Sequence, residues 1–264
     1  MHETSRPTAG HPHSLPIPNV GELVARSCRA HAEQPAVTSA ARSISYAELE
    51  QRSNRVANAL LAQGLARGDR VGIYLPNCVE IVEIEIACYK AGLIKAPFNA
   101  RLSPREVGDI AANSDASIIV TTAARAEAFK PHLQSADVRL LLLDGPADSN
   151  YEALLARASD RFQPVDVHEH EVAVLHYTSG SSGVLKAAMQ TFGNRLAQLR
   201  KFLMRGEGMQ AGHVLGLVGP VTHASGMQMV PALCTGATIH LFSGFEPGAF
   251  MAEMQARRVT HTFM

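Results

Sequence analysis

The sequence predicts an α/β fold with stacked, largely parallel β-sheets and helices on their faces. Three observations lead to this prediction. Apolar runs of strand length alternate with helical segments from about residue 20 to the end of the chain. Two of the expected helices begin with the Ser-x-x-Glu spacing of a capping box. The composition of the 264 residues, 46% hydrophobic and 18% charged, is that of a globular protein with roughly one to two domains.

The helices are predicted from their end signals and their apolar faces. Ser45 and Glu48 form the first capping box, and Gly64 is placed to end the helix that follows. Ser103 and Glu106 form the second box, with a proline at the first helical position. Further helices are expected at residues 78–91, 124–133, 151–158, 192–204, 225–234 and 249–257.

Short apolar runs between these helices predict the strands, and the alternating order supplies the crossovers that a parallel sheet needs. The strands are expected at residues 70–76, 93–98, 117–121, 138–143, 172–176, 214–218, 238–242 and 259–264. The last of these has no turn or cap after it. This favours a chain cut off within a domain over an ordinary C-terminal edge strand.

The charge balance argues against a polyanionic partner. Lys plus Arg and Asp plus Glu both number 24, so the formal net charge is zero, and no polybasic block indicates nucleic acid or a membrane surface. No apolar run approaches the ~18 residues of a membrane span. Residues 1–18 lack the apolar core of a signal peptide and are interpreted as a disordered lead. The four scattered cysteines predict free thiols in a cytoplasmic protein, and nothing predicts the oligomeric state.

Two groups of titratable side chains are interpreted as structural. Glu80, Glu83 and Glu85 are expected on a solvated face of the helix at 78–91, rather than as an acid/base pair. His168 and His170 offer too few convergent ligands at zinc spacing, so no metal site is predicted and a solvated loop is expected there.

The segment YTSGSSGVLK at residues 177–186 carries the strongest functional signal. It directly follows the strand at 172–176. Its glycines let the backbone approach phosphate oxygens, and its successive N–H groups and hydroxyls can donate to them. Lys186 adds a mobile positive charge. The spacing excludes a Walker A loop, a G-x-G-x-x-G fingerprint and a G-x-S-x-G elbow. A purely structural Ser/Gly loop is the alternative interpretation.

This segment resembles the phosphate-binding signature Y-T-S-G-[ST]-[TS]-G-x-P-K-G of the AMP-forming, adenylate-forming enzymes. Leu185 stands in place of the usual Pro, and Ala187 in place of the usual Gly. Weaker matches extend the resemblance along the chain from about residue 20. They are SYAEL at 45–49, GDRV at 68–71, LPN at 75–77, KAG at 90–92, NARLS at 99–103 and PVTHASG at 220–226.

The resemblance implies an AMP-forming carboxylic acid–CoA ligase that activates a fatty or aryl acid through an acyl-adenylate. ATP and CoA would be co-substrates, and the Mg²⁺ ligand is expected outside this chain, together with the adenine and ribose contacts and the catalytic lysine. The residues implied to bind the ATP phosphates are Thr178, Ser179, Gly180, Ser181, Ser182, Gly183 and Lys186. A chain of these 264 residues alone is expected to be inactive. The alternative is a truncated, noncatalytic nucleotide-binding or interaction module.

The resemblance also implies that His223 lines the acyl pocket and acts as a steric and hydrogen-bonding gate between the carboxylate and the thiol. The helix expected at 225–234 predicts a neutral imidazole, since the dipole at a helix N-terminus disfavours imidazolium. A helix-capping histidine without a catalytic role is the alternative. Met227 and Met229 are expected in the core or in the acyl pocket.

The domain organisation follows from the same resemblance. Residues 1–18 are expected to be a lead, and residues 19–264 an incomplete N-terminal AMP-binding domain with a boundary between its subregions near 165–212. The small C-terminal domain of the family is expected outside the chain.

Overall fold

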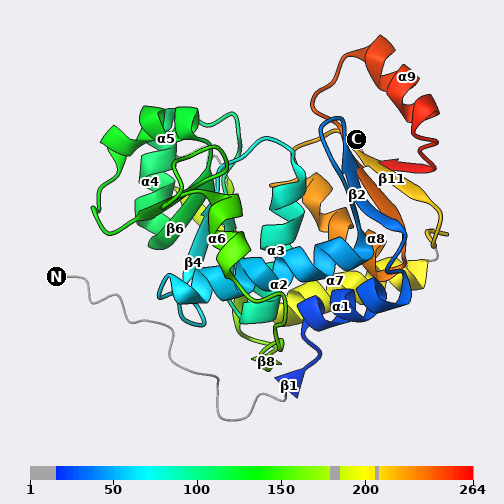
Figure 1. The fold of residues 1–264 in the computed structure, drawn as a ribbon, viewed down its shortest axis with the longest axis horizontal. Helices are drawn as coiled ribbons and strands as arrows, with labels where there is room; N and C mark the ends of the chain where they lie inside the picture. Colours follow the sequence, from blue (N-terminus) through cyan, green and yellow to red (C-terminus); the bar gives the residue numbers. More distant parts are fainter. Residues whose placement is uncertain (1–15, 179–184, 206–207, 264) are drawn as a thin grey trace.

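The computed structural model describes residues 16–178, 185–205 and 208–263 (Figure 1). Two larger sheets dominate this part of the chain. In the six-stranded sheet the order is β10-β9-β5-β4-β6-β7, and all neighbours are parallel except the edge pair β10–β9. Its strands are β4 (Arg70–Ile73), β5 (Ile94–Pro97), β6 (Ala116–Thr121), β7 (Arg139–Leu142), β9 (Val172–Thr178) and β10 (Lys186–Thr191).

In the five-stranded sheet the order is β13-β11-β12-β2-β3, and only the edge pair β2–β3 is antiparallel. Its strands are β2 (Pro35–Ser39), β3 (Ser43–Ser45), β11 (Val214–Leu217), β12 (Thr238–Leu241) and β13 (His261–Phe263). The prediction of stacked, largely parallel sheets is therefore confirmed. A two-stranded sheet joins β1 (Pro16–Ile17) to β8 (Val167–His168), so the part of the expected lead that the structure describes ends in a strand.

The helices form layers around the two sheets (Figure 1). One layer lies between the sheets and contacts both of them. It contains α1 (Val20–Ala30), α2 (Tyr46–Ala62), α3 (Val79–Ala91), α7 (Phe192–Arg205) and α8 (Met229–Cys234). The other helices are α4 (Pro104–Ser114), α5 (Ala123–Phe129), α6 (Tyr151–Arg157) and α9 (Pro247–Ala256), with 3₁₀ turns η1 (Lys130–His132) and η2 (Ala224–Gln228). Helices α4 and α5 cover the outer face of the six-stranded sheet, and α9 lies beyond the five-stranded one.

The local signals that set the helix ends act as predicted. Ser45 and Glu48 form a reciprocal capping box at the start of α2, and Ser103 and Glu106 form one at the start of α4. Helix α3 ends at Gly92, whose φ of 66° is easily adopted only by glycine. Among the described residues, no helix is long and apolar enough to cross a membrane.

The expectation of a solvated carboxylate face on α3 is wrong. Glu83 and Glu85 are fully buried, because α3 lies in the layer between the sheets and packs on all sides. Each carboxylate is instead compensated internally. Glu83 accepts hydrogen bonds from Arg52 and Tyr151 at 2.6 and 2.8 Å. Burial raises the pKa of Glu83, against the lowering effect of these donors.

Candidate functional site

The predicted phosphate loop connects two antiparallel strands at the edge of the six-stranded sheet. Thr178 ends β9, Lys186 begins β10, and the two residues are paired in register. The loop residues Ser179, Gly180, Ser181, Ser182 and Gly183 lie outside the described residues, as does the side chain of Thr178. Lys186 is exposed at the point where the loop returns to the sheet. The structure therefore gives the loop two fixed ends that are side by side.

Strand β10 was not expected from the sequence. Its residues KAAMQT show little alternation of apolar and polar side chains, because an edge strand has one edge and much of its surface exposed. The sequence does contain a signal for the end of β10, namely Thr191 followed by Asn194. The amide of Thr191 donates to Asn194 Oδ1 and the amide of Asn194 donates to Thr191 Oγ1, which fixes the start of α7.

Asn77 joins the carboxyl ends of the two sheets. It follows β4, and its Nδ2 donates to the carbonyl of Gly219 at 3.0 Å, while the amide of Val221 donates to its Oδ1 at 3.0 Å. Gly219 and Val221 belong to the segment after β11 that leads to His223. In α/β proteins, ligands bind beyond the carboxyl ends of parallel strands. The bridge made by Asn77 therefore lies where a ligand site is expected.

The turn that carries His223 is tightly folded. A Cβ atom on Gly226 would lie 1.8 Å from the carbonyl oxygen of Val221, so only glycine fits there. His223 is half-buried, and its Nδ1 lies 3.0 Å from Thr222 Oγ1. Burial lowers the pKa of His223 below its ordinary value, which favours the neutral ring at pH 7.

The neutral form of His223 was predicted for a different reason. The expected helix at 225–234 is divided into the 3₁₀ turn η2 and the short helix α8, so no regular α-helix begins beside the imidazole. The division follows from the sequence order: Pro231 cannot donate a backbone hydrogen bond, and Gly226 is pressed against Val221. Desolvation, rather than a helix dipole, lowers the pKa.

A second histidine, His176 on β9, lies within electrostatic reach of His223. Burial is the main cause that lowers its pKa to about 4, and the positive charges of Lys95 and Arg195 lower it further. Glu85 acts in the opposite direction, and His223 adds a smaller lowering effect. The structure places His176 beside a buried charge cluster.

This buried charge cluster contains Glu85 and Tyr89 of α3, Lys95 of β5 and Arg195 of α7. Lys95 Nζ donates to Glu85 Oε2 at 2.6 Å, and Tyr89 donates to Oε1 at 3.0 Å. Arg195 Nη2 lies 3.6 Å from Oε1. Glu85 is 0% exposed, and Lys95 and Arg195 are each 4% exposed. One carboxylate thus faces two cations, and burial lowers the pKa of Lys95.

Neither Lys95 nor Arg195 was predicted from the sequence as a functional residue. A signal was available for Lys95, since a lysine within the apolar strand IKAP must find a buried partner. No pattern pairs residues 85, 95 and 195 before the fold is known. Met229 lies in the core, Met227 is half-buried, and the described residues contain no cluster of three or more potential metal ligands.

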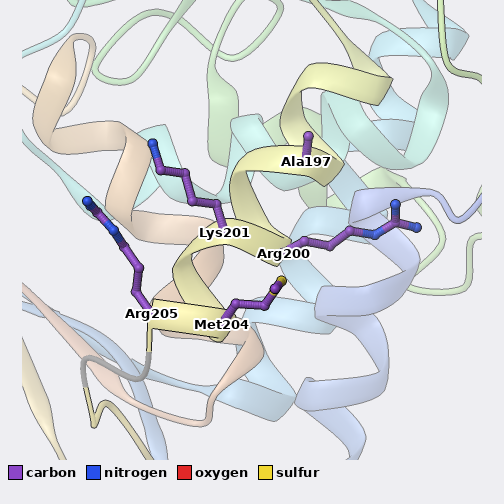
Figure 2. Close-up of a pocket in the computed structure, with 5 residues that line it drawn as sticks. All are labelled: Ala197, Arg200, Lys201, Met204 and Arg205. Atoms are coloured by element: carbon purple, nitrogen blue, oxygen red, sulfur yellow. The ribbon is translucent and has the colours of Figure 1, made fainter.

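A shallow depression also lies on the exposed side of α7 (Figure 2). Its lining combines basic and apolar side chains: Ala197, Arg200, Lys201, Met204 and Arg205. In Figure 2, Lys201 and Arg205 extend toward the same side, whereas Arg200 extends away from them. The opposite side of α7, with Arg195, Leu196 and Leu199, is buried.

The two largely parallel sheets and their helices define an α/β fold, and the signature at residues 177–186 runs from the end of β9 to the start of β10. The chain belongs to the AMP-binding enzyme family, whose model matches residues 24–264. The predicted resemblance is thus confirmed.

Curated relatives agree with this assignment. Feruloyl-CoA synthase from Amycolatopsis sp. is 34% identical over 246 residues, which cover 92% of this chain and 48% of the relative. 4-Coumarate–CoA ligase 2 from Nicotiana tabacum is 29% identical over 257 residues, which cover 94% of this chain and 46% of the relative. The chain therefore spans about half the length of the curated relatives it matches.

Solved structures show the same fold. A long-chain-fatty-acid-CoA ligase from Archaeoglobus fulgidus superposes with a TM-score of 0.84 at 22% identity, over 96% of this chain and 52% of that one. ATP-bound MatB from Rhodopseudomonas palustris superposes with a TM-score of 0.78 at 26% identity, over 90% and 48% of the two chains.

Proposed function

We propose that this chain is part of an AMP-forming carboxylic acid–CoA ligase and supplies its ATP-phosphate loop and its acyl gate. The observation that carries the proposal is the hairpin register, which sets Thr178 opposite Lys186 at the two ends of the YTSGSSG segment. Membership of the AMP-binding enzyme family and the 34% identity to a feruloyl-CoA synthase support it. Residues 19–264 would form the N-terminal part of the AMP-binding domain, with the small domain supplied outside this range, in a cytoplasmic protein.

The reaction has two steps. A carboxylate oxygen of the acid attacks the α-phosphorus of ATP, and pyrophosphate leaves with the bonding electrons. The thiolate sulfur of CoA then attacks the acyl carbon, and AMP leaves. Phosphoryl transfer depends mainly on positioning and charge stabilisation. Residues 178–183 would donate backbone and hydroxyl hydrogens to the phosphates, and Lys186 would add a positive charge at the mouth of the loop.

Mg²⁺ would supply further neutralisation of the phosphate charge when it is bound. On the family resemblance, we place its protein ligand outside residues 1–264, together with the adenine and ribose contacts. Because the imidazole of His223 is neutral, it would not compete with Lys186 for the phosphates. It would control access between the carboxylate and the thiol by its volume and its hydrogen bond.

The test is acid-dependent ATP–pyrophosphate exchange by the purified native protein. The panel pairs aryl acids (ferulate, 4-coumarate, benzoate) with fatty acids of eight and sixteen carbons. We expect exchange with at least one acid, and a Lys186→Ala variant should raise KM for ATP about tenfold through the lost charge. ATP binding without exchange for any acid would contradict the ligase proposal and favour a noncatalytic nucleotide-binding module. The 264-residue chain expressed alone should show no exchange above the same Lys186→Ala control.

His223 is tested by two substitutions in the native protein. His223→Ala should slow adenylation while leaving KM for ATP nearly unchanged, because the phosphates are bound at residues 178–186. His223→Phe keeps a ring of similar width and removes the proton chemistry, so it should retain much more activity than His223→Ala. Equal damage by both substitutions would argue against the steric gate and for proton transfer.

A further inference from the structure

The buried charge cluster contains one polar atom without a partner. Arg195 Nε is buried and makes no hydrogen bond, although the guanidinium bonds to several groups through its other nitrogens. Nη1 donates to Gln198 Oε1 at 2.7 Å and to Gln190 Oε1 at 3.3 Å, and Nη2 faces Glu85 at 3.6 Å. The guanidinium carbon lies 5.8 Å from the centre of the Tyr89 ring. A planar group with five donors is thus incompletely satisfied, which is costly for a buried charge.

The contacts of Arg195 link the two parts of the proposed site. Gln190 belongs to β10, the strand that leaves the phosphate loop at Lys186. Gln198 is one turn further along α7, and its Nε2 donates to the carbonyl of Met227 at 3.1 Å. Met227 lies in η2, the 3₁₀ turn that follows His223 directly. A continuous chain of side-chain bonds therefore runs from the loop hairpin, through Arg195 and Gln198, to the His223 turn.

Stability alone does not account for this arrangement. A buried ion pair is often no more stabilising than apolar residues of the same volume. Here two cations share one carboxylate, and one guanidinium nitrogen is left unsatisfied. A buried group with such an unmet hydrogen bond calls for an explanation, and a functional role is one. The role must involve what Arg195 connects, which is strand β10 and the turn after His223.

We propose that Arg195 is a positioning residue that, through Gln198, fixes the His223 turn relative to the hairpin of the phosphate loop. This inference rests on the proposed function, and it adds a residue that acts on the acyl gate through the turn that follows His223. Arginine is needed because its planar fork contacts Gln190, Gln198 and Glu85 at once, which a lysine ammonium with a single nitrogen does not do in the same geometry.

The kinetic test is a double-mutant cycle in the native protein. Arg195→Met should lower kcat for adenylation about tenfold with less than about a twofold change in KM for ATP. If Arg195 acts through His223, the double variant Arg195→Met/His223→Ala should be no slower than His223→Ala alone. Arg195→Lys should restore little of the lost rate. Additive losses in the cycle would overturn the proposal.

Gln198→Glu provides a gentler variant if Arg195→Met fails to fold. A carboxylate at 198 keeps an acceptor for Arg195 but cannot donate to the carbonyl of Met227. It should therefore reproduce the kcat defect with little loss of stability. The matched control is Lys90→Met, which removes a buried cation of α3 whose Nζ donates to residues of α2. It should leave kcat unchanged, both alone and in combination with His223→Ala.

A spectroscopic measurement tests whether Arg195 positions the His223 turn without the need for an activity assay. The imidazole ¹H–¹³C signals of His223, assigned with His223→Ala, should shift in Arg195→Met and in Gln198→Glu but not in Lys90→Met. Unchanged His223 signals in both site variants would refute the proposal even in an active enzyme. A native protein that lacks acid-dependent exchange would refute the proposed function instead, and the signals would still show whether Arg195 positions the turn.

Discussion

Two buried cations close to α3 differ in how completely they are satisfied. Lys90 Nζ donates to Glu50 at 2.7 Å, to Ser53 at 2.9 Å and to Asn54 at 2.7 Å, which uses all three of its hydrogens. These partners all belong to α2. Arg195, by contrast, contacts residues of α3, β10 and α7 itself and shares the carboxylate of Glu85 with Lys95. Within the part of the chain that the structure describes, its Nε has no hydrogen-bond partner.

The difference separates anchoring from positioning. The hydrogen bonds of Lys90 Nζ are complete and all go to α2, so that Lys90 fixes α2 against α3. None of these partners lies in the turn of His223. The site of Arg195 is open: it carries a surplus positive charge, lowers the pKa of His176 and reaches the turn of His223 through Gln198. Both cations are desolvated, so burial alone does not identify a functional charge. A functional charge is identified by the residues that the charged group contacts.

The largest effect is expected at the shared carboxylate. Glu85→Gln removes the negative charge that Lys95 and Arg195 share, and among the described residues no other carboxylate pairs with these two buried cations. Such a change should cost about 3–5 kcal/mol of unfolding free energy, measured by urea denaturation. Glu80→Gln, on the same helix but partly exposed and paired with Arg42 at 3.1 Å, should cost less than about 1 kcal/mol. Equal losses would show that the cluster is not held by Glu85.

The next largest loss of stability is expected for Lys90. Lys90→Met should destabilise the protein by about 3 kcal/mol, because three polar partners lose their donor. Glu50 is partly exposed and can be rehydrated, which keeps the loss below that of Glu85→Gln. The rate of adenylation per folded molecule should stay as in the unsubstituted protein. A selective fall in kcat would break the distinction between the two cations.

A fall in pH should destabilise the folded protein through His176, which lies beside the cluster of Glu85, Lys95 and Arg195. His176 has a pKa of about 4 in the folded protein and about 6.5 when unfolded, so the unfolded chain binds its proton first as the pH falls. The stability it contributes is complete above pH 6.5 and is lost as the pH falls toward 4, by about 2–3 kcal/mol. His223 and His240, whose pKa values burial also lowers, act with the same sign.

Removing one of the charges that face His176 tests the cause of this acid dependence. Arg195→Met should raise the pKa of His176 and narrow the acid-sensitive range, followed by NMR titration and by thermal unfolding at several pH values. Lys95 and Glu85 still act on His176 in that variant. A pKa of His176 that does not move would mean that the charge of Arg195 does not contribute to its lowering.

The smallest effect is expected for the turn that follows His223, where the contacts of Arg195 and Gln198 end. Gly226→Ala places a Cβ against the carbonyl of Val221, so the turn must move, at a cost of about 1–3 kcal/mol. The shift should reduce adenylation severalfold with KM for ATP unchanged. Gly244→Ala, where a Cβ meets nothing within 4 Å, is the control and should be silent in both measurements. Full activity of Gly226→Ala would show that the position of the turn is unimportant.

The sequence by itself determined the features that depend on neighbouring residues. Both capping boxes, the end of α3 at Gly92 and most strands follow from local hydrogen bonding, glycine conformation and apolar patterning. The signature at residues 177–186 likewise identified the family, because a contiguous loop carries its chemistry in one segment.

Only the tertiary structure decided which polar groups are buried and what they contact. The burial of Glu83 and Glu85 follows from the position of α3 between two sheets. The apolar residues on all sides of α3 are typical of a buried helix, but they do not encode the partners of the two carboxylates. The contacts of Glu85 with Lys95 and Arg195 join residues 10 and 110 positions apart, and Asn77 meets Val221 across 144 positions. Such pairings depend on how the layers pack, since the free energy of a buried charge is set by the partners that folding brings to it.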